Sequence, residues 1–404
     1  MASKWAGWLL LLAGTCVRAA AQTGFTREQV LAPPQPIAFG EWQKTAEPLG
    51  GIEYLERFPS AVTTPYRENN TVPLMVFVPE NRDKPAPVVL ITHYWGATDL
   101  KAETSLATDL NARGLAAAIV TLPYHLTRTP PGFRSGQLAI QPDPARLQEM
   151  MVQSEQDVRR SLDFLDSRPE FIHGSYGLVG TSLGAVVSGL VFAIDSRIQY
   201  SAFVLGGADL AHILWNSSRV IAQRDAMRRA GWTEAKVRTA LAAVEPLNYL
   251  PRTDPGTVLM ISGKYDTVVP RECTRELLAK LPGAQRVEID TGHYGGIFVE
   301  KKVLRTVADF LSSTMNGHKY TAPKQLEAPT VRIGGLLSTP QGADIAIGID
   351  FIHLDREGKG FGSFFATPRG IRLYLGREIA QGLSIGFVGS GQGVGVGLAW
   401  SVVL

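Results

Sequence analysis

The chain has 404 residues, of which 45% are hydrophobic, and it carries a formal net charge of +3. This length allows one large domain with a well-filled core and a smaller unit beside it. The small net charge argues against a nucleic-acid partner, because a binding surface for nucleic acid is strongly basic.

The first 21 residues have the pattern of a secretory signal. Lys4 precedes an apolar run over residues 5–12, and Ala19 to Ala21 supply the small side chains of a cleavage site. The run is too short to span a bilayer. We therefore expect residues 1–21 to be a signal peptide and the protein to be exported, periplasmic or secreted. The alternative is an uncleaved N-terminal anchor.

The two cysteines, Cys16 and Cys273, bear on stability in the expected compartment. If the signal is removed, Cys273 is the only cysteine left, and an internal disulfide is excluded in spite of an oxidising destination. We therefore expect the fold to be held by its core alone.

After an N-terminal extension over residues 22–50, apolar runs alternate with helical patterns through residues 51–317. Such alternation predicts an α/β fold, a mostly parallel sheet with helices on both faces. The predicted strands are 71–79, 88–92, 115–122, 176–180, 200–205, 258–262 and 286–289. The predicted helices include 144–167, 183–194 and 271–281.

Residues 209–250 are polar and helical in pattern, without a strand. They separate two predicted strands, so they form either a helical cap over a site or an ordinary long crossover. Both interpretations stay open at this stage.

The amino-acid composition changes after residue 317. Residues 318–329 have the prolines of a linker, and residues 330–404 are rich in glycine with apolar residues at alternate positions, the period of β-strands. About six short strands fit this segment. The alternation allows an outer-membrane association, but six strands are fewer than a single-chain membrane barrel has. We expect a small β-module packed on the main domain.

A Gly-x-Ser-x-Gly motif at Gly180 to Gly184 follows a predicted strand and precedes a predicted helix. This is the setting of a nucleophile elbow, which exposes the serine, here Ser182, on a strained turn. A second match at Gly382 to Gly386 lies in the glycine-rich segment with no helical pattern behind it. We interpret the second match as coincidence.

A serine hydroxyl needs a histidine to take its proton and a carboxylate to orient that histidine. Asp266 and His293 each follow a predicted strand, and the order Ser182, Asp266, His293 runs along the chain. Asp290 and Asp209 are rival acids. The carboxyl ends of parallel strands share one edge of the sheet, so we expect these groups to meet there.

The chain has, in order, a strand, a loop, a nucleophile elbow, an acid after a late strand and a histidine near the end of the domain. This combination resembles the α/β-hydrolase superfamily, in particular its dienelactone-hydrolase-like and acyl-esterase-like members. The resemblance implies an oxyanion hole made by two backbone N–H groups. The first belongs to Leu183, directly after the nucleophile. The second comes from the loop after His93, where Tyr94 replaces a common glycine, so the donor is Trp95 or Tyr94.

Four further residues are candidates for substrate positioning, because they follow strands at the same sheet edge: His93, Tyr124, His125 and Arg128. The alternative for the last three is a rigid loop with solvated charges, held by Pro123 and the Pro-Pro-Gly turn at 130–132. The motifs of phosphate and dinucleotide sites do not follow any predicted strand, and the sequence holds no metal-binding cluster, so we expect no cofactor and no metal.

These patterns predict a serine hydrolase acting on a small-molecule carboxylic ester through a Ser-His-Asp triad. Two alternatives remain: a serine peptidase of the same fold, and a catalytically silent relative that binds a surface or partner. The sequence leaves the oligomeric state open.

Overall fold

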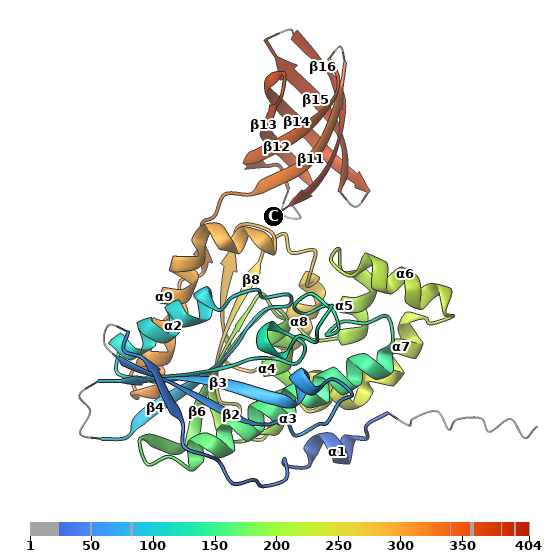
Figure 1. Ribbon diagram of the computed structural model, residues 1–404. Coiled ribbons are helices and arrows are strands. Elements are labelled where there is room, and N and C mark those ends of the chain that lie inside the picture. Colours follow the sequence, from blue (N-terminus) through green and yellow to red (C-terminus); the bar gives the residue numbers. More distant parts are fainter. Residues whose placement is uncertain are drawn as a thin grey trace, which may run out of the picture.

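A computed structural model describes residues 24–48, 51–80, 84–339, 341–355, 359–380, 382–391 and 393–403. The strands form a ten-stranded open sheet and, at the end of the chain, a closed six-stranded barrel. Figure 1 shows the barrel as a separate unit at one end of the α/β domain, whose helices surround the open sheet. The predicted signal, residues 1–21, and Cys16 with it, lies outside the described residues.

The open sheet has the strand order β1-β2-β3-β5-β4-β6-β7-β8-β9-β10. Its strands are β1 (Gln43–Ala46), β2 (Gly51–Pro59), β3 (Thr71–Pro79), β4 (Ala86–Thr92), β5 (Ala116–Val120), β6 (Phe171–Thr181), β7 (Ile198–Val204), β8 (Thr257–Gly263), β9 (Gln285–Ile289) and β10 (Gln325–Leu326). Pairing is antiparallel from β1 to β5 and parallel from β5 to β10. The loops after the parallel strands therefore meet at one edge.

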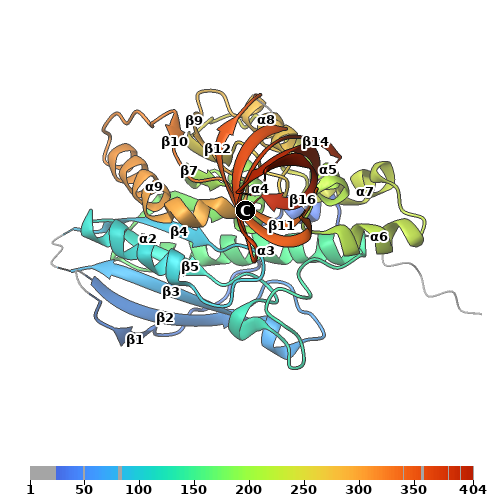
Figure 2. The ribbon, with the colours of Figure 1, turned by 90° about the horizontal axis from the view of Figure 1, so that it is seen from above.

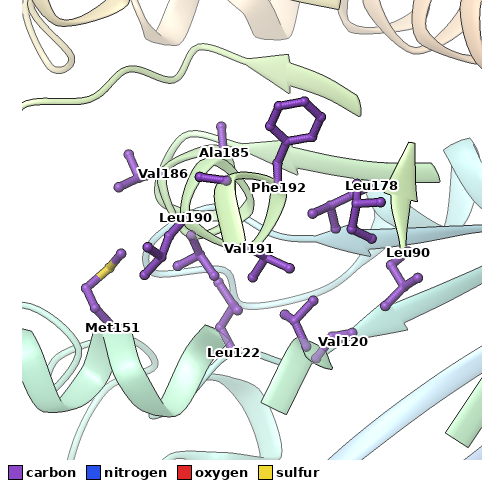
Figure 3. Packing of buried hydrophobic residues seen from close by; sticks show 14 of the residues in the cluster. Leu90, Val120, Leu122, Met151, Leu178, Ala185, Val186, Leu190, Val191 and Phe192 are labelled. Carbon is purple, nitrogen blue, oxygen red and sulfur yellow. The ribbon is translucent and has the colours of Figure 1, made fainter. Parts of the chain in front are cut away.

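Helices cover both faces of this sheet. Successive side chains of a strand point to opposite faces, so Leu90 and Leu178 pack with α3 and α4, whereas Val89 and Val179 pack with α2 and α9. Figure 3 shows the first of these two cores. The helices are α1 (Arg27–Leu31), α2 (Lys101–Ala112), α3 (Pro144–Asp166), α4 (Leu183–Ile194), α5 (Leu210–Asn216), α6 (Ile221–Arg229), α7 (Glu234–Leu241), α8 (Arg271–Ala279) and α9 (Glu300–Met315). Among the described residues, no helix is both long and apolar enough to cross a membrane.

Short 3₁₀ helices occupy several of the connections between these elements. They are η1 (Arg67–Asn70), η2 (Leu126–Arg128), η3 (Ala242–Val244), η4 (Pro246–Asn248) and η5 (Tyr294–Val299). The N-terminal extension lies against α3, where the Arg159 guanidinium donates to the backbone oxygens of Val30 and Ala32. It also supplies β1, the edge strand next to β2.

The predicted α/β class is confirmed, and each predicted strand and helix has a counterpart. Three strands escape the sequence analysis. The apolar positions of β2 are interrupted by Glu53, Glu56 and Arg57, and β1 is a polar edge strand of four residues. Strand β10 falls inside residues 318–329, which we expected to be a linker, and it pairs with β9.

The C-terminal barrel consists of β11 (Val331–Ser338), β12 (Gly342–His353), β13 (Gly360–Thr367), β14 (Gly370–Ala380), β15 (Leu383–Ser390) and β16 (Gly393–Val403). The number of strands agrees with the sequence, but they close into a barrel because β16 pairs with β11. Closure of so few strands leaves a narrow interior. A Cβ on Gly334 would lie 1.8 Å from the carbonyl oxygen of Trp400, so only glycine fits there.

One end of the barrel contacts the α/β domain. The His353 ring lies 4.4 Å from the Tyr265 ring, and the Thr330 hydroxyl donates to the backbone oxygen of Asp290. Figure 2, seen from above, shows the barrel over the sheet. Tyr265 precedes Asp266, so this end of the barrel meets the loop that carries the predicted acid.

Candidate active site

Ser182 lies at the sharp turn between β6 and α4. Its backbone has φ 53° and ψ −113°, a strained conformation for a residue with a side chain. The flanking glycines are required by close packing. A Cβ on Gly180 would lie 2.3 Å from the oxygen of Gly184, and one on Gly184 would lie 2.4 Å from the oxygen of Thr92. The motif is therefore a nucleophile elbow in geometry as well as in sequence.

The structure brings Ser182, His293 and Asp266 together. Oγ of Ser182 lies 2.9 Å from Nε2 of His293, and Nδ1 of the same ring lies 2.7 Å from Oδ2 of Asp266. A carboxylate only accepts hydrogen bonds, so Nδ1 carries the proton and Nε2 is free to accept the serine proton. Both Asp266 and His293 are buried, which strengthens their interaction.

The acid is fixed by its own loop. Oδ1 of Asp266 accepts the backbone N–H groups of Val268 and Val269 at 2.8 and 2.9 Å. The two rivals are engaged elsewhere: Asp209 caps α5 and pairs with Arg238, and Asp290 pairs with Lys264. Asp266 is therefore the acid that the geometry assigns to His293.

The expected oxyanion hole lies between two segments. Leu183 is the first residue of α4, so its N–H points out of the helix N-terminus beside Ser182. On the other side, the N–H of Gly96 is already donated to Nε2 of His125 at 3.0 Å. This leaves Trp95 and Tyr94 as the two candidates for the second donor, and the choice between them stays open.

Two cavities meet at Ser182. The smaller one, of about 90 Å³, is lined almost entirely by apolar side chains, including Met150, Leu214 and Leu241. The larger one, of about 550 Å³, also borders His293 and contains polar side chains. Ser182 and Trp95 line both cavities, so a group bound at Ser182 has room on two sides.

Comparison with known proteins identifies the fold. No family model matches the sequence, and no curated protein matches it either. Among solved structures, an acetyl xylan esterase from Paenibacillus sp. R4 has a TM-score of 0.54 at 18% identity, covering 70% of this chain and 92% of its own. Acetyl xylan esterase 1 from Thermoanaerobacterium sp. JW/SL YS485 has a TM-score of 0.52 at 14% identity, with the same two coverages.

The chain has the α/β-hydrolase fold. At these identities the likeness establishes the fold alone, so the fold that the resemblance implied is confirmed. In this α/β-hydrolase fold, Ser182, Asp266 and His293 lie at the carboxyl edge of the parallel strands β6, β8 and β9.

His93 and His125 are not substrate ligands, which corrects our expectation. Both rings are fully buried, and each bridges two backbone groups. Nδ1 of His93 lies 2.9 Å from the oxygen of Tyr94, and its Nε2 accepts the N–H of Leu122. Burial lowers the pKa of His93 to about 4 and that of His125 to about 3. These neutral rings therefore brace the loop after β4 against the loop after β5.

Tyr124 and Arg128 are also structural. Arg128 is fully buried, where its guanidinium donates to Asp157 at 2.8 Å and to the backbone oxygens of Asn69 and Thr121. Tyr124 is 5% exposed and packs against Tyr66. Neither residue lines the two cavities at Ser182. The rigid-loop alternative agrees with this packing, but its solvated charge does not, because the Arg128 guanidinium is buried.

The second Gly-x-Ser-x-Gly match is unrelated to the site. Ser384 is buried inside the barrel, where its hydroxyl bonds to that of Tyr374 at 2.9 Å. It lies within β15 rather than on a strand-to-helix turn, so the interpretation as coincidence agrees with its position.

Sequence reasoning missed the polar side chains of the larger cavity. The Arg219 guanidinium lies over the rings of Trp95 and Tyr294, 5.1 and 5.8 Å from their centroids. Glu103 is 4% exposed, and its Oε2 has no hydrogen-bond partner among the described residues. Burial, together with Glu300 and Asp99, raises the pKa of Glu103 to about 7. Nothing in the local sequence distinguishes either residue from an ordinary surface charge.

Residues 209–250 form one wall of the smaller cavity. Leu210, Ile213 and Leu214 of α5 and Leu241 of α7 line it, while α7 packs against α3. The segment therefore lies against the site, the position that the cap interpretation predicts. In the part of the chain that the structure describes, no group of three metal-binding side chains comes together.

Proposed function

We infer that this chain is a serine hydrolase that cleaves carboxylic esters through an acyl-enzyme intermediate. The observation that carries this proposal is the His293 ring, which lies 2.9 Å from Oγ of Ser182 and 2.7 Å from Asp266. This is the arrangement in which a serine hydroxyl becomes a competent nucleophile. The strained elbow at Ser182 and the two adjoining cavities support it.

The proposed reaction has two steps. Oγ of Ser182 attacks the ester carbonyl carbon while Nε2 of His293 takes its proton, and Asp266 stabilises the imidazolium. The N–H of Leu183, with that of Trp95 or Tyr94, stabilises the negative oxygen. His293 then returns the proton to the departing alcohol as the C–O bond breaks. Water attacks the acyl-enzyme by the same route, which releases the acid and restores Ser182.

The two cavities suggest which part of an ester each of them binds. The smaller one is apolar and, at about 90 Å³, holds less than a cavity of ~150 Å³ that takes benzene. It fits a short acyl chain, in keeping with the acetyl esters in the names of the two fold relatives. The larger cavity, with Arg219, Glu103 and Tyr294 in its wall, takes the alcohol part.

Hydrolysis of p-nitrophenyl esters from acetate to palmitate tests this proposal. The chain without residues 1–21 is compared with its Ser182→Ala variant. We expect turnover that depends on Ser182 and is fastest for acetate to butyrate. Turnover that survives in Ser182→Ala would contradict the mechanism. If no ester is hydrolysed but a peptide p-nitroanilide is cleaved, the protein is a peptidase. If neither kind of substrate is hydrolysed, it is a binding protein.

We also propose that the protein is exported. The support is the sequence of residues 1–21, with its apolar run and its small residues before Gln22. N-terminal sequencing of the protein from a cell envelope or medium fraction tests this. A start near Gln22 is expected, and an intact Met1 in the cytoplasm would contradict the proposal.

A further inference from the structure

The C-terminal barrel has its apolar side chains on the outside. Of the large hydrophobic side chains that are exposed in the described residues, twenty belong to the barrel segment and seven to the rest of the chain. Soluble monomers rarely expose so much contiguous apolar surface. The barrel wall is therefore built to contact something other than water.

This apolar surface runs around the whole circumference. Each of the six strands contributes exposed side chains at alternate positions, with exposed fractions from 37% for Leu373 to 80% for Val394. One representative of each strand, in chain order, is Ile333, Ile347, Phe364, Leu373, Phe387 and Val396. A single protein partner would cover one side of the barrel, whereas a hydrocarbon phase contacts every side.

The interior holds the polar groups. Arg332 pairs with Asp350, and Arg372 pairs with Asp344, each at 2.8 Å with side chains at most 6% exposed. Burying charges in this way is costly unless they are paired, and here the pairs also lie away from the outer wall. A cluster of buried hydrophobic side chains packs beside these ion pairs, so the interior is mixed. The outer wall, in contrast, is apolar, as it is in a membrane barrel.

The lengths of three strands also suit a bilayer, although the barrel has fewer strands than the ~8 of the smallest single-chain membrane barrels. Strands β12, β14 and β16 have 12, 11 and 11 residues, and the other three have 8 each. A tilted strand needs ~9–11 residues to cross the hydrocarbon region. Polar residues sit at both ends, with Arg369 at the far turn and Lys359 at the turn near the α/β domain. Among the described strand residues, the charged side chain exposed on the outer wall is that of Arg377. In the strand register Arg377 lies opposite Gly360, next to the turn near the α/β domain.

We propose that the barrel of residues 331–403 inserts into a lipid bilayer and anchors the α/β domain at one membrane face. The outer wall contacts acyl chains, while Trp400 and Phe351, near the domain end, lie toward the headgroups as interfacial aromatic residues do. Because His353 touches Tyr265, the loop with Asp266 lies beside that membrane face. The inference is independent of the proposed hydrolysis.

Vesicle flotation tests the insertion. The chain without residues 1–21 is folded with extruded vesicles of phosphatidylcholine and phosphatidylglycerol, washed with alkaline carbonate and floated on a density gradient. The wild type is expected to float. Phe387 and Val396 face each other on β15 and β16. Arginine at both should lower the floating fraction at least ~30-fold, because a lipid-facing arginine is strongly disfavoured.

The matched control places the same charge on the α/β domain. Ile172 is an exposed isoleucine on β6, and Ile172→Arg is expected to float like the wild type. Circular dichroism checks that each variant folds. Flotation of the Phe387→Arg, Val396→Arg double variant equal to the wild type would overturn the proposal. A wild type that stays in the aqueous phase as a defined dimer would also overturn it, because a second copy of the chain would then cover the outer wall of the barrel.

A second measurement does not depend on charged variants. Lipids brominated on the acyl chains quench tryptophan fluorescence only at short range. They should quench the emission of the wild type and act much less on Trp400→Phe, a conservative change on the outer wall. Equal quenching of both proteins would place Trp400 outside the bilayer and overturn the proposal.

Discussion

Nε2 of His125 accepts the backbone N–H of Gly96 across 3.0 Å. The bond joins the loop after β5 to the loop after β4, which faces Ser182. A second bond joins the same loops, from Nε1 of Trp95 to the oxygen of Gly136 at 2.8 Å. The position of the proposed second oxyanion donor therefore depends on a histidine that does not line the cavities at Ser182.

His125→Ala should slow the chemical step more than it weakens binding. Losing one oxyanion donor costs ~10²–10³ in kcat, and a displaced donor costs part of this, so we expect kcat to fall ~10- to 100-fold with little change in KM. Steady-state kinetics on p-nitrophenyl acetate measures the split. His173→Ala, at an exposed histidine, is the control. A change confined to KM would show that His125 acts on binding.

Arg128→Met should destabilise the fold without a direct effect on the triad. It leaves Asp157 buried without its cation, and breaking a buried ion pair costs about 3–5 kcal/mol. Urea unfolding followed by circular dichroism measures the loss. Arg134→Met, at an exposed arginine of the same loop, should change stability by less than ~0.5 kcal/mol. Equal stability of the two variants would contradict the structural role of Arg128.

Ile213→Ala should lengthen the preferred acyl chain. Ile213 lines the smaller cavity from α5, and each methylene that fits an apolar pocket changes kcat/KM by ~10- to 200-fold. We expect the ratio of hexanoate to acetate hydrolysis to rise at least ~tenfold. Ile221→Ala, on the exposed side of α6, should leave the ratio unchanged. An unchanged ratio in Ile213→Ala would place the acyl group elsewhere.

Glu103 should make stability depend on pH. Its pKa is about 7 in the folded state and ordinarily 4.5, so the folded protein holds this proton more tightly. The stability that the proton contributes is complete below pH 4.5 and is lost as the pH rises through 7. Wild type should therefore lose ~2–3 kcal/mol more than Glu103→Gln between pH 5 and pH 8. Parallel stability profiles from urea unfolding would contradict this.

The meeting of Ser182, Asp266 and His293 could be predicted from the sequence because all three residues lie at strand ends. Ser182, Asp266 and His293 each follow an apolar run, and parallel strands bring such ends together regardless of the intervening chain. The roles of His93 and His125 could not be predicted, because a histidine that binds a substrate and one that accepts a backbone N–H have the same local sequence. Only tertiary packing distinguishes them.

The sequence also predicted the barrel only in part. Alternation in residues 330–404 predicts strands but does not say which face is inside. Arg332 and Asp350 lie on different strands, and their pairing becomes visible only when β11 and β12 are placed side by side. Closure itself depends on the pairing of β16 with β11, two strands at opposite ends of the segment. The position of residues 209–250 beside the smaller cavity likewise depends on their packing against α3, which the sequence does not show.

Fluorophosphonate labelling followed by peptide mass spectrometry tests the central claim most directly, because the probe reacts with a serine that a histidine has activated. We expect one equivalent of label on Ser182 of the wild type and none on Ser182→Ala or on Ser384. A folded wild type that stays unlabelled, or that is labelled at another serine, would contradict the assignment of Ser182 as the nucleophile.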